Sequence, residues 1–205
     1  MRHRTTAAVI ALAILSPMRS IAFAAPIDPP RLEIGPQTTQ TYLPINPVGN
    51  VQYQPSIGGT GSITLRSWIA LDSSVGITPT IPITGSSFSG GRLTEGLLGT
   101  RIGFRIGRVE IYGKVRPGFA SFGKAILHAE SSGSSLQFEF GRLTEPALDL
   151  GGIVMVRISR RLAVRYDVGD TLIHYRERTI EPNQPPSAGV FANSLQLGAA
   201  FVFCF

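Results

Sequence analysis

The stretch Leu195-Gln-Leu-Gly-Ala-Ala-Phe-Val-Phe-Cys-Phe205 alternates between two kinds of side chain. Every second residue is apolar, and the series ends on Phe201, Phe203 and Phe205. The residues between them are smaller or more polar. Because successive side chains of a β-strand point to opposite faces, this stretch predicts a strand with one bulky apolar face and one small face. The rest of the chain indicates what the apolar face contacts.

The amino end has the three parts of an export signal. Two early arginines supply positive charge, Ala7–Leu15 is a run of nine apolar residues, and Ala22-Phe-Ala24 is an A-x-A cleavage site. The apolar run is much shorter than the roughly 20 residues of a membrane-spanning helix. No cysteine follows it, which argues against lipoprotein processing. We therefore predict a cleaved signal peptide over residues 1–24 and one exported domain over residues 25–205.

The composition of the exported part excludes several classes of protein. The formal charge falls from +6 to +3 when the three arginines of the signal leave, which is too small to indicate nucleic-acid binding. The single cysteine, Cys204, excludes an internal disulfide and a thiolate zinc cluster. The mean hydropathy of +0.17 is high for a soluble exported domain. Apolar residues spread over short alternating segments are what the wall of a closed membrane barrel requires.

Eight alternating segments follow the signal. Tight reversals at 66–68, 106–108 and 159–161 each join two of them, and longer polar stretches make the other connections. Alternately long and short connections are typical of outer-membrane barrels with short periplasmic turns and long external loops, with both chain ends on the periplasmic side. The predicted strands are Arg31–Thr39, Ser56–Leu65, Trp68–Thr78, Thr94–Ile106, Arg108–Phe119, Ala147–Ile158, Arg161–His174 and Asn193–Phe205.

The predicted fold class is all-β, an eight-stranded antiparallel up-and-down transmembrane β-barrel. Pro36 interrupts the first segment, whose alternation is the poorest of the eight. Within the third polar stretch, Leu136–Leu143 also alternates and is interpreted as an extension of a strand above the membrane. The polar stretches predicted as loops are roughly 40–55, 79–91, 119–146 and 175–192.

Charged residues occupy the face opposite the apolar one in four of the segments. An eight-stranded barrel is just wide enough for side chains to fill its interior, and an unpaired buried charge is costly. Charges of mixed sign therefore favour a plug of ion pairs over the alternative, a conducting pore. The predicted lumen charges are Arg101, Arg105, Glu110, Lys114, Arg116, Asp149, Arg157, Arg165 and Asp167.

Four stretches resemble the paired-strand pattern of small outer-membrane β-barrel proteins of the OmpA/OmpX-like kind. They are Gly91–Phe104, Ile111–Phe119, Arg160–Asp170 and Leu195–Phe205, so the resemblance covers roughly residues 91–205. The resemblance implies a membrane-embedded eight-stranded barrel and no catalytic residues. It also implies that the outer-membrane barrel assembly machinery recognises the last strand, in which Phe201, Phe203 and Phe205 are the predicted assembly signal.

Few residues of the sequence indicate enzymatic chemistry. His128 and His174 are the only histidines after the signal, and barrel enzymes that modify lipid A use a histidine with a serine. A lone histidine at a strand end or in a polar loop is more typical of an interfacial or solvated residue. The glycine pairs 58–59 and 151–152 lack the helix start and Lys-Ser/Thr of a phosphate loop, and relief of crowding in a curved wall explains them better. We predict no catalytic, cofactor-binding or metal-binding residue.

Together these patterns predict a monomeric, porin-like protein in the outer membrane of a Gram-negative cell, with a structural or adhesive role or weak passage of small solutes. Its predicted partners are outer-membrane lipid, lipopolysaccharide and the barrel assembly machinery, with no nucleic acid. Two alternatives come from other classes. One is an outer-membrane lipid-modifying enzyme, and the other is a secreted soluble β-sandwich that acts as a binding module.

Overall fold

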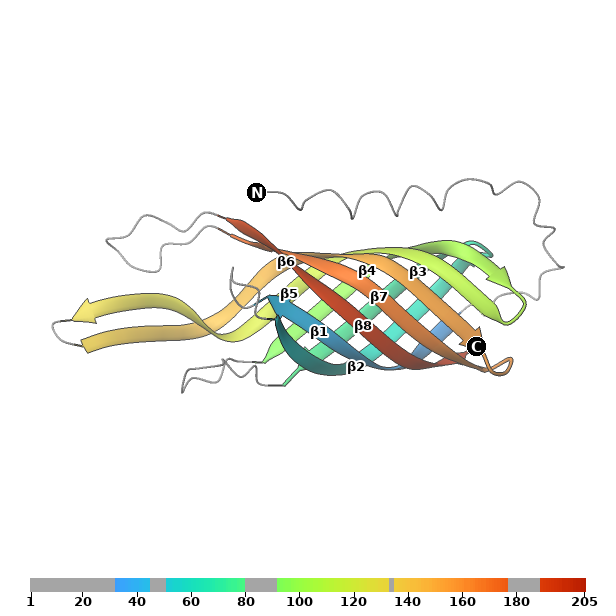
Figure 1. Ribbon diagram of the computed structural model, residues 1–205, viewed down its shortest axis with the longest axis horizontal. Helices are drawn as coiled ribbons and strands as arrows, with labels where there is room; N and C mark the ends of the chain where they lie inside the picture. Colours follow the sequence, from blue (N-terminus) through green and yellow to red (C-terminus); the bar gives the residue numbers. More distant parts are fainter. Residues whose placement is uncertain (1–31, 45–50, 80–91, 133–134, 177–188) are drawn as a thin grey trace.

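Eight antiparallel strands form a closed barrel in the computed structural model of the protein (Figure 1). The structure describes residues 32–44, 51–79, 92–132, 135–176 and 189–205, so the predicted signal peptide lies outside the described residues. Each strand pairs with the next along the chain, which confirms the predicted eight-stranded up-and-down fold. The strands are β1 (Leu32–Pro44), β2 (Val51–Arg66), β3 (Ile69–Thr78), β4 (Leu93–Ile106), β5 (Val109–Ser132), β6 (Ser135–Arg157), β7 (Leu162–Tyr175) and β8 (Val190–Cys204).

The first and last strands close the barrel at one end. β1 pairs with β8 from Glu33↔Cys204 onward. Beside this pair, the Phe205 amide donates to the Leu32 carbonyl (2.9 Å), and the Leu32 amide donates to the Phe205 carbonyl (3.4 Å). The two chain ends of the barrel therefore lie together, on the right in Figure 1.

The three predicted tight reversals are confirmed, and they lie at this same end. They connect β2 to β3, β4 to β5 and β6 to β7. In the second turn, Gly107 has a φ of 60°, which glycine adopts without the steric cost of a Cβ. We call this the turn end of the barrel and the opposite end the loop end.

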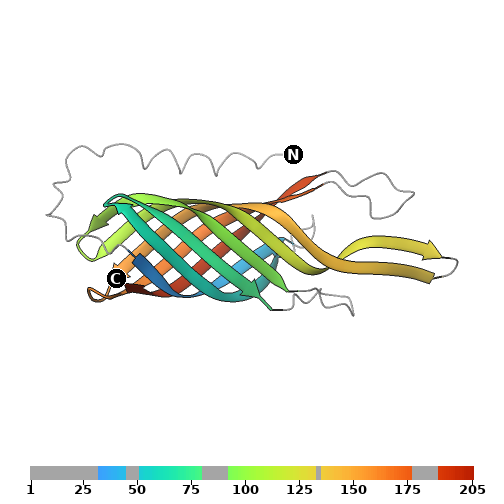
Figure 2. The same ribbon diagram turned by 180° about the vertical axis from the view of Figure 1, so that it is seen from behind.

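Two of the predicted loops are shorter than expected because strand pairing continues into them. β1 and β2 pair as far as Pro44↔Val51, so much of the predicted loop 40–55 is strand. The predicted loop 119–146 is also wrong, because β5 and β6 pair as far as Ser132↔Ser135. This agrees with the extension read from Leu136–Leu143. Beyond Phe122 and Ala147 the backbones of β5 and β6 have no other strand partner in the described residues, and they form a ribbon that projects past the loop end (Figure 2).

Two prolines lie within barrel strands where a ladder is interrupted. The β1–β8 register passes from Ile34↔Phe203 to Gln37↔Ala200 and omits Pro36. The β4–β5 register likewise omits Pro117. Proline has no amide hydrogen to donate, so each strand keeps a full ladder on one side only at these positions. The first segment, whose alternation is poor, is nevertheless a strand of 13 residues.

Side chains alternate between a filled interior and an apolar outer surface. In β7, for example, Ala163, Arg165 and Asp167 are almost fully buried, whereas Tyr166 and Val168 are 53% and 52% exposed. The same alternation holds around the wall. Charged residues point inward, and large apolar residues point outward. The exposed apolar residues of the wall include Ile34, Ile57, Val75, Leu98, Ile102, Val115, Val154, Val168, Leu197 and Phe201.

The glycine pairs mark places where neighbouring strands come very close. A Cβ on Gly151 would lie 2.1 Å from the Val168 carbonyl oxygen, and one on Gly58 would lie 1.8 Å from the Val75 carbonyl oxygen. The second member of each pair has space, since a Cβ on Gly152 or Gly59 would approach nothing nearer than 3.6 Å. Only the first glycine of each pair is thus required by crowding in the wall.

We therefore expect Gly151→Ala to destabilise the protein by about 1–3 kcal/mol, because the added methyl overpacks a backbone contact. Gly152→Ala is the matched control and is expected to change stability by less than about 1 kcal/mol. The measurement is urea unfolding followed by the fluorescence of Trp68, the only tryptophan of the chain. Equal effects of the two substitutions would contradict the close approach at Gly151.

Candidate functional site: the charged interior

The barrel interior holds a dense set of charged side chains. Eight of the nine predicted lumen charges are at most 6% exposed, and the ninth, Arg105, has a side chain that is 25% exposed at the turn end. The structure places four acids with them that the sequence reasoning missed. These are Glu33, Asp72, Glu95 and Glu145, each at most 9% exposed.

Three aspartates and three bases form a cluster at mid-height. Arg116 lies at its centre, with its Nη2 2.6 Å from Asp149 Oδ2 and its Nη1 3.0 Å from Asp72 Oδ2. Lys114 contacts the same Asp149 at 2.8 Å and also pairs with Asp167. Each base therefore touches at least two carboxylates, which compensates the loss of hydration that burial imposes on every member.

Arg165 completes this cluster from the opposite wall. Its Nη1 and Nη2 donate to the two carboxylate oxygens of Asp72 at 2.7 and 2.9 Å. Its Nε donates to Asp167 at 2.8 Å. Asp72 is on β3 and Arg165 is on β7, which face each other across the eight-stranded barrel. The bidentate pair thus spans the lumen, in the geometry that makes arginine–carboxylate contacts strong.

A second cluster lies nearer the turn end, around two glutamates. Glu33 on β1 accepts from Arg101 on β4 at 2.5 Å and from Arg157 on β6 at 3.1 Å. Ser62 donates to Glu33 as well, at 2.7 Å. Arg101 also lies 3.7 Å from Asp72, so it links the second cluster to the first.

Glu110 is the other acid of the second cluster. It pairs with Arg157 and lies 3.5 Å from Arg105. The Tyr112 hydroxyl donates to Glu110 at 2.8 Å, and the Arg101 guanidinium lies 4.5 Å above the Tyr112 ring. The aromatic face of Tyr112 and the carboxylate of Glu33 together stabilise the buried guanidinium of Arg101.

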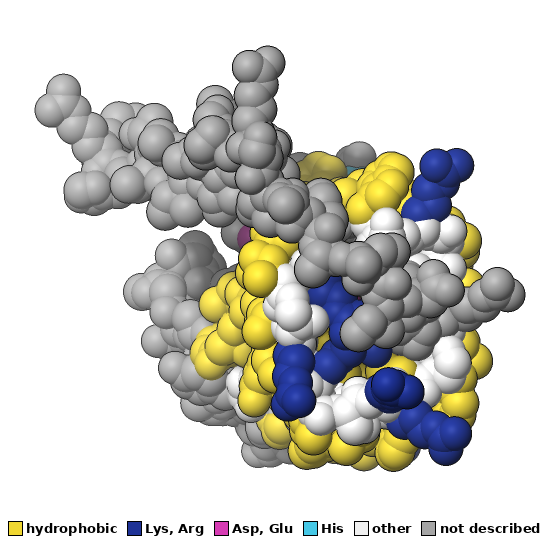
Figure 3. Space-filling view, turned by 90° about the vertical axis from the view of Figure 1, so that its right-hand side faces the viewer, with side chains coloured by type: hydrophobic (Ala, Val, Ile, Leu, Met, Phe, Trp, Pro, Cys, Tyr) yellow, Lys and Arg dark blue, Asp and Glu magenta, His cyan; other side chains and the backbone are white. Residues whose placement is uncertain are grey.

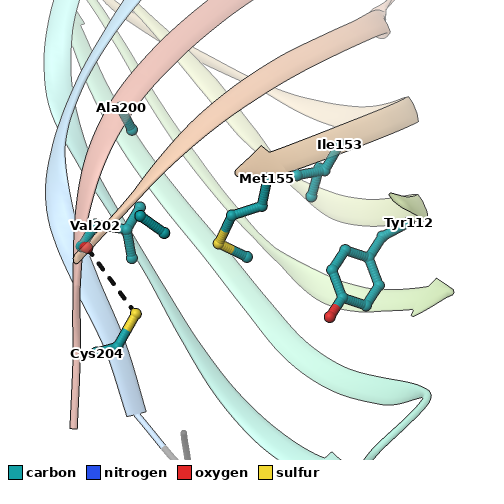
Figure 4. Close-up of a cluster of buried hydrophobic side chains, with 7 residues drawn as sticks. Tyr112, Ile153, Met155, Ala200, Val202 and Cys204 are labelled. Carbon is teal, nitrogen blue, oxygen red and sulfur yellow. Dashed lines mark hydrogen bonds between the residues drawn. The ribbon is translucent and has the colours of Figure 1, made fainter. Parts of the chain in front are cut away.

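A small apolar group fills the space beside these ion pairs (Figure 4). It contains Tyr112, Ile153, Met155, Ala163, Ala200, Val202 and Cys204. The thiol of Cys204 is buried and free, and its sulfur accepts from Arg157 at 3.4 Å. The thiol therefore has a packing role on the inner face, as the alternation predicted.

The loop half of the interior is less charged. Glu95 on β4 accepts two hydrogen bonds from the Gln196 amide on β8, at 3.0 and 2.9 Å, again between opposite walls. Glu145 lies 3.7 Å from the exposed Arg176. A second apolar group fills the lumen here, formed by Leu93, Leu97, Ala120, Ala147 and Ile173 with Phe122 and Tyr175 packed against it.

A pocket lies between the charged cluster and the β1–β3 wall. Small residues such as Gly58, Ser74 and Gly76 line one side of it, and Glu95 and Lys114 line the other. Its cavity volume is ≈ 20 Å³, which is enough for roughly one or two water molecules. The buried Gln37 Oε1, which lacks a protein partner, borders this pocket. The pocket therefore suits water and not a larger ligand.

The missed acids lie where alternation is weak. Asp72 follows Leu71 but precedes two serines, and Glu33 lies three residues before Pro36. The sequence signal was nonetheless present, because the nine predicted charges comprise six bases and three acids. In an interior that must pair its charges, this surplus of bases required further acids.

The histidines show no catalytic arrangement in the described part of the protein. His174 packs its ring on Phe191, with 4.5 Å between centroids. The side chain of His128 lies outside the described residues. Among the described residues there is no group of histidine, cysteine and acids suited to a metal ion, and no helix long and apolar enough to cross a membrane.

The three phenylalanines of the predicted assembly signal lie on the outer surface. Phe201, Phe203 and Phe205 are 59%, 52% and 73% exposed. They follow the seam where β8 meets β1. Their alternation with Val202 and Cys204, which are buried, agrees with the strand predicted from the sequence.

Comparison with solved structures defines the class of fold. The crystal structure of Neisserial surface protein A matches with a TM-score of 0.54 and 12% identity, over 85% of this chain and 97% of that chain. The outer membrane protein AlkL, determined in lipid bilayers, matches at 15% identity over 91% of this chain and 95% of that chain, with a TM-score of 0.49. The match to Neisserial surface protein A, together with the closed eight-stranded barrel, shows that the chain has the fold of the small outer-membrane β-barrels, and the resemblance to OmpA/OmpX-like barrels is confirmed for the fold. No protein-family model and no curated protein sequence matches the chain.

We expect Asp72→Ala to destabilise the protein by about 3–5 kcal/mol, because Arg116 and Arg165 would lose a buried counter-charge. Asp170→Ala is the matched control. Asp170 is on β7 but is only half-buried, and it has one weak hydrogen bond from Asn193 at 3.5 Å. Its loss is expected to cost less than about 1 kcal/mol. Urea unfolding followed by Trp68 fluorescence measures both, and a small effect of Asp72→Ala would contradict the network.

Proposed function

We propose that the protein is an integral outer-membrane barrel with a lumen closed by paired charges, and that its role is structural or adhesive. The observation that carries this proposal is the inverted arrangement of side chains, with charges inside and large apolar residues outside. A soluble sandwich buries its apolar faces between two sheets and exposes its polar faces. The present arrangement supports insertion into lipid and argues against the soluble binding module.

The outer surface has the chemistry of a membrane-facing wall. Leu98, Val75 and Phe201 are each more than half exposed, and they lie on different strands around the barrel. Every acidic side chain that the structure describes is buried inside, apart from the half-buried Asp170. An apolar band of this kind on a closed barrel is what a bilayer accepts, because the closed sheet presents no open strand edge to the lipid.

Cross-lumen contacts at three heights support a closed interior. Glu33–Arg157 lies near the turn end, Asp72–Arg165 at mid-height and Glu95–Gln196 toward the loop end. Each joins strands that are three or four positions apart around the barrel. An ion moving along the axis would have to break contacts in which buried charges are mutually satisfied, so steady conduction is disfavoured.

The ribbon of β5 and β6 supports an adhesive role. It continues to the pair Ser132↔Ser135, well beyond the last contacts with β4 and β7. Both edges of this ribbon lack strand partners in the described residues. Unpaired strand edges bind extended segments of other proteins by strand addition.

Lipopolysaccharide and the barrel assembly machinery are the proposed partners. Arg92, Arg142 and Arg176 are exposed at the loop end, and arginine recognises phosphate groups of the kind that lipid A carries. The outward Phe201, Phe203 and Phe205 are accessible to a machinery that recognises the last strand. No described feature favours the enzyme alternative, since His174 packs on an aromatic ring.

The test is a planar-bilayer recording of protein purified from detergent-solubilised outer membrane. We expect no stable conductance, or only rare small openings, because ion pairs fill the lumen. Arg116→Ala removes the central base and is expected to raise the leak, whereas the outward Val115→Ala, on the neighbouring position of β5, is the control and is expected to stay silent.

Two results would contradict the proposal. Recovery of the folded protein in the periplasm without detergent would exclude membrane integration. Steady single-channel currents from the unmodified protein, with ion selectivity that shifts on removal of an interior charge, would replace the closed lumen with a pore.

A further inference from the structure

Among the described residues, the exposed charged side chains of the turn end are all positive. Arg66 ends β2, Arg108 lies in the β4–β5 turn, and Arg160 and Arg161 lie in the β6–β7 turn. All four are exposed, and we call them the turn-end arginines. In Figure 3, which views this end directly, Lys and Arg side chains gather around the mouth of the barrel and apolar side chains surround them.

The turn-end arginines have no acidic partner within the described part of the protein. The ion pairs of the interior engage other bases, and Glu110, two residues after Arg108, is buried and pairs with Arg157 and Arg105. Four guanidinium groups on the tight turns thus present unneutralised positive charge outward. Their counter-charge has to come from outside the described chain.

Exposed apolar side chains lie within three residues of each of these arginines in the sequence. Leu65 precedes Arg66 and is 56% exposed, Ile106 precedes the second turn and is 56% exposed, and Ile158 precedes the third and is 53% exposed. Trp68, next to Arg66 in the first turn, is 49% exposed. Tryptophan prefers the level of lipid headgroups. The arginines therefore lie just past the edge of the apolar band, where the headgroups of one leaflet would begin.

We propose that the turn-end arginines bind the phosphate headgroups of anionic phospholipids in the leaflet that surrounds the turn end. This inference rests on the proposed membrane integration. Guanidinium groups donate two parallel hydrogen bonds to a phosphate, and basic residues at an anionic membrane surface attract its lipids. Because the arginines are distributed over three separate hairpins, they would hold a ring of headgroups around the rim and fix the depth of the barrel.

Trp68 makes a direct test possible, because the only tryptophan of the chain lies among the turn-end arginines. The folded protein is placed in phosphatidylcholine vesicles that contain a minor fraction of brominated lipid, either phosphatidylglycerol or phosphatidylcholine with the same brominated chains. Bromine quenches tryptophan only at short range, so the ratio of the two quenching efficiencies measures which headgroup is enriched at the turn end.

The wild-type protein is expected to favour phosphatidylglycerol at the turn end by about fivefold per engaged site, the factor that corresponds to about 1 kcal/mol for one basic residue. High salt is expected to reduce the preference. The triple variant Arg66→Gln, Arg108→Gln and Arg161→Gln leaves only Arg160 of the turn-end arginines and is expected to remove most of the preference. The control Arg92→Gln, Arg142→Gln and Arg176→Gln removes the same number of exposed charges from the loop end and is expected to retain the preference.

The outcomes separate this inference from the proposed function. Equal quenching by both lipids in a correctly folded wild-type barrel would overturn the headgroup site and leave membrane integration intact. Persistence of the preference in the turn-end triple variant would also overturn it. If the preference is lost when phosphate replaces chloride at equal ionic strength, the arginines bind a soluble phosphate anion and not the lipid headgroups. That result would also overturn the headgroup site. Failure of the wild-type protein to fold in any vesicle would contradict the proposed function itself.

Discussion

A charge inside an eight-stranded barrel is removed from bulk water, so it needs its counter-charge within the lumen. Asp72 shows how the protein meets this constraint. Its two oxygens accept from Arg165 on the opposite wall, and Arg116 lies 3.0 Å from one of them. Arg116 and Arg165 in turn engage Asp149 and Asp167, respectively. The charges of this cluster therefore share partners, so removal of one would leave others without a counter-charge.

The need to pair charges inside the barrel also agrees with where the other charged and apolar residues lie. Acids gather inside, where they balance the interior bases, and the exposed charges of the described residues are all arginines. The wall between the two ends is left apolar, and the lumen is filled by ion pairs and two apolar groups. A barrel with this distribution presents lipid-compatible sides and cationic rims. If the interior is closed as proposed, contacts with other molecules form at the surfaces and at the projecting β5–β6 ribbon.

The sequence alone predicts the strands, the three tight turns and nine of the inward charges of β4 to β7, because alternation is a local property. Glu110, Lys114 and Arg116 could be assigned to the interior from β5 alone. Asp72 and Glu33 could not be found in this way, because serines and Pro36 obscure the alternation around them. The partner of each charge could not be predicted either. The contact between Asp72 and Arg165 depends on the register and stagger of all eight strands, which no local pattern encodes. The length of β5 and β6 was underestimated because a stretch rich in serine and glycine resembles a loop.

A double-mutant cycle between Asp72 and Arg165 tests the cross-lumen contact most directly. The free energies of unfolding of Asp72→Asn, Arg165→Gln and the double variant are compared with that of the unmodified protein. Because the two side chains share a bidentate contact between opposite walls, the coupling energy is expected to exceed about 1 kcal/mol. Additive effects, with a coupling energy near zero, would contradict an interior held together by ion pairs across the lumen.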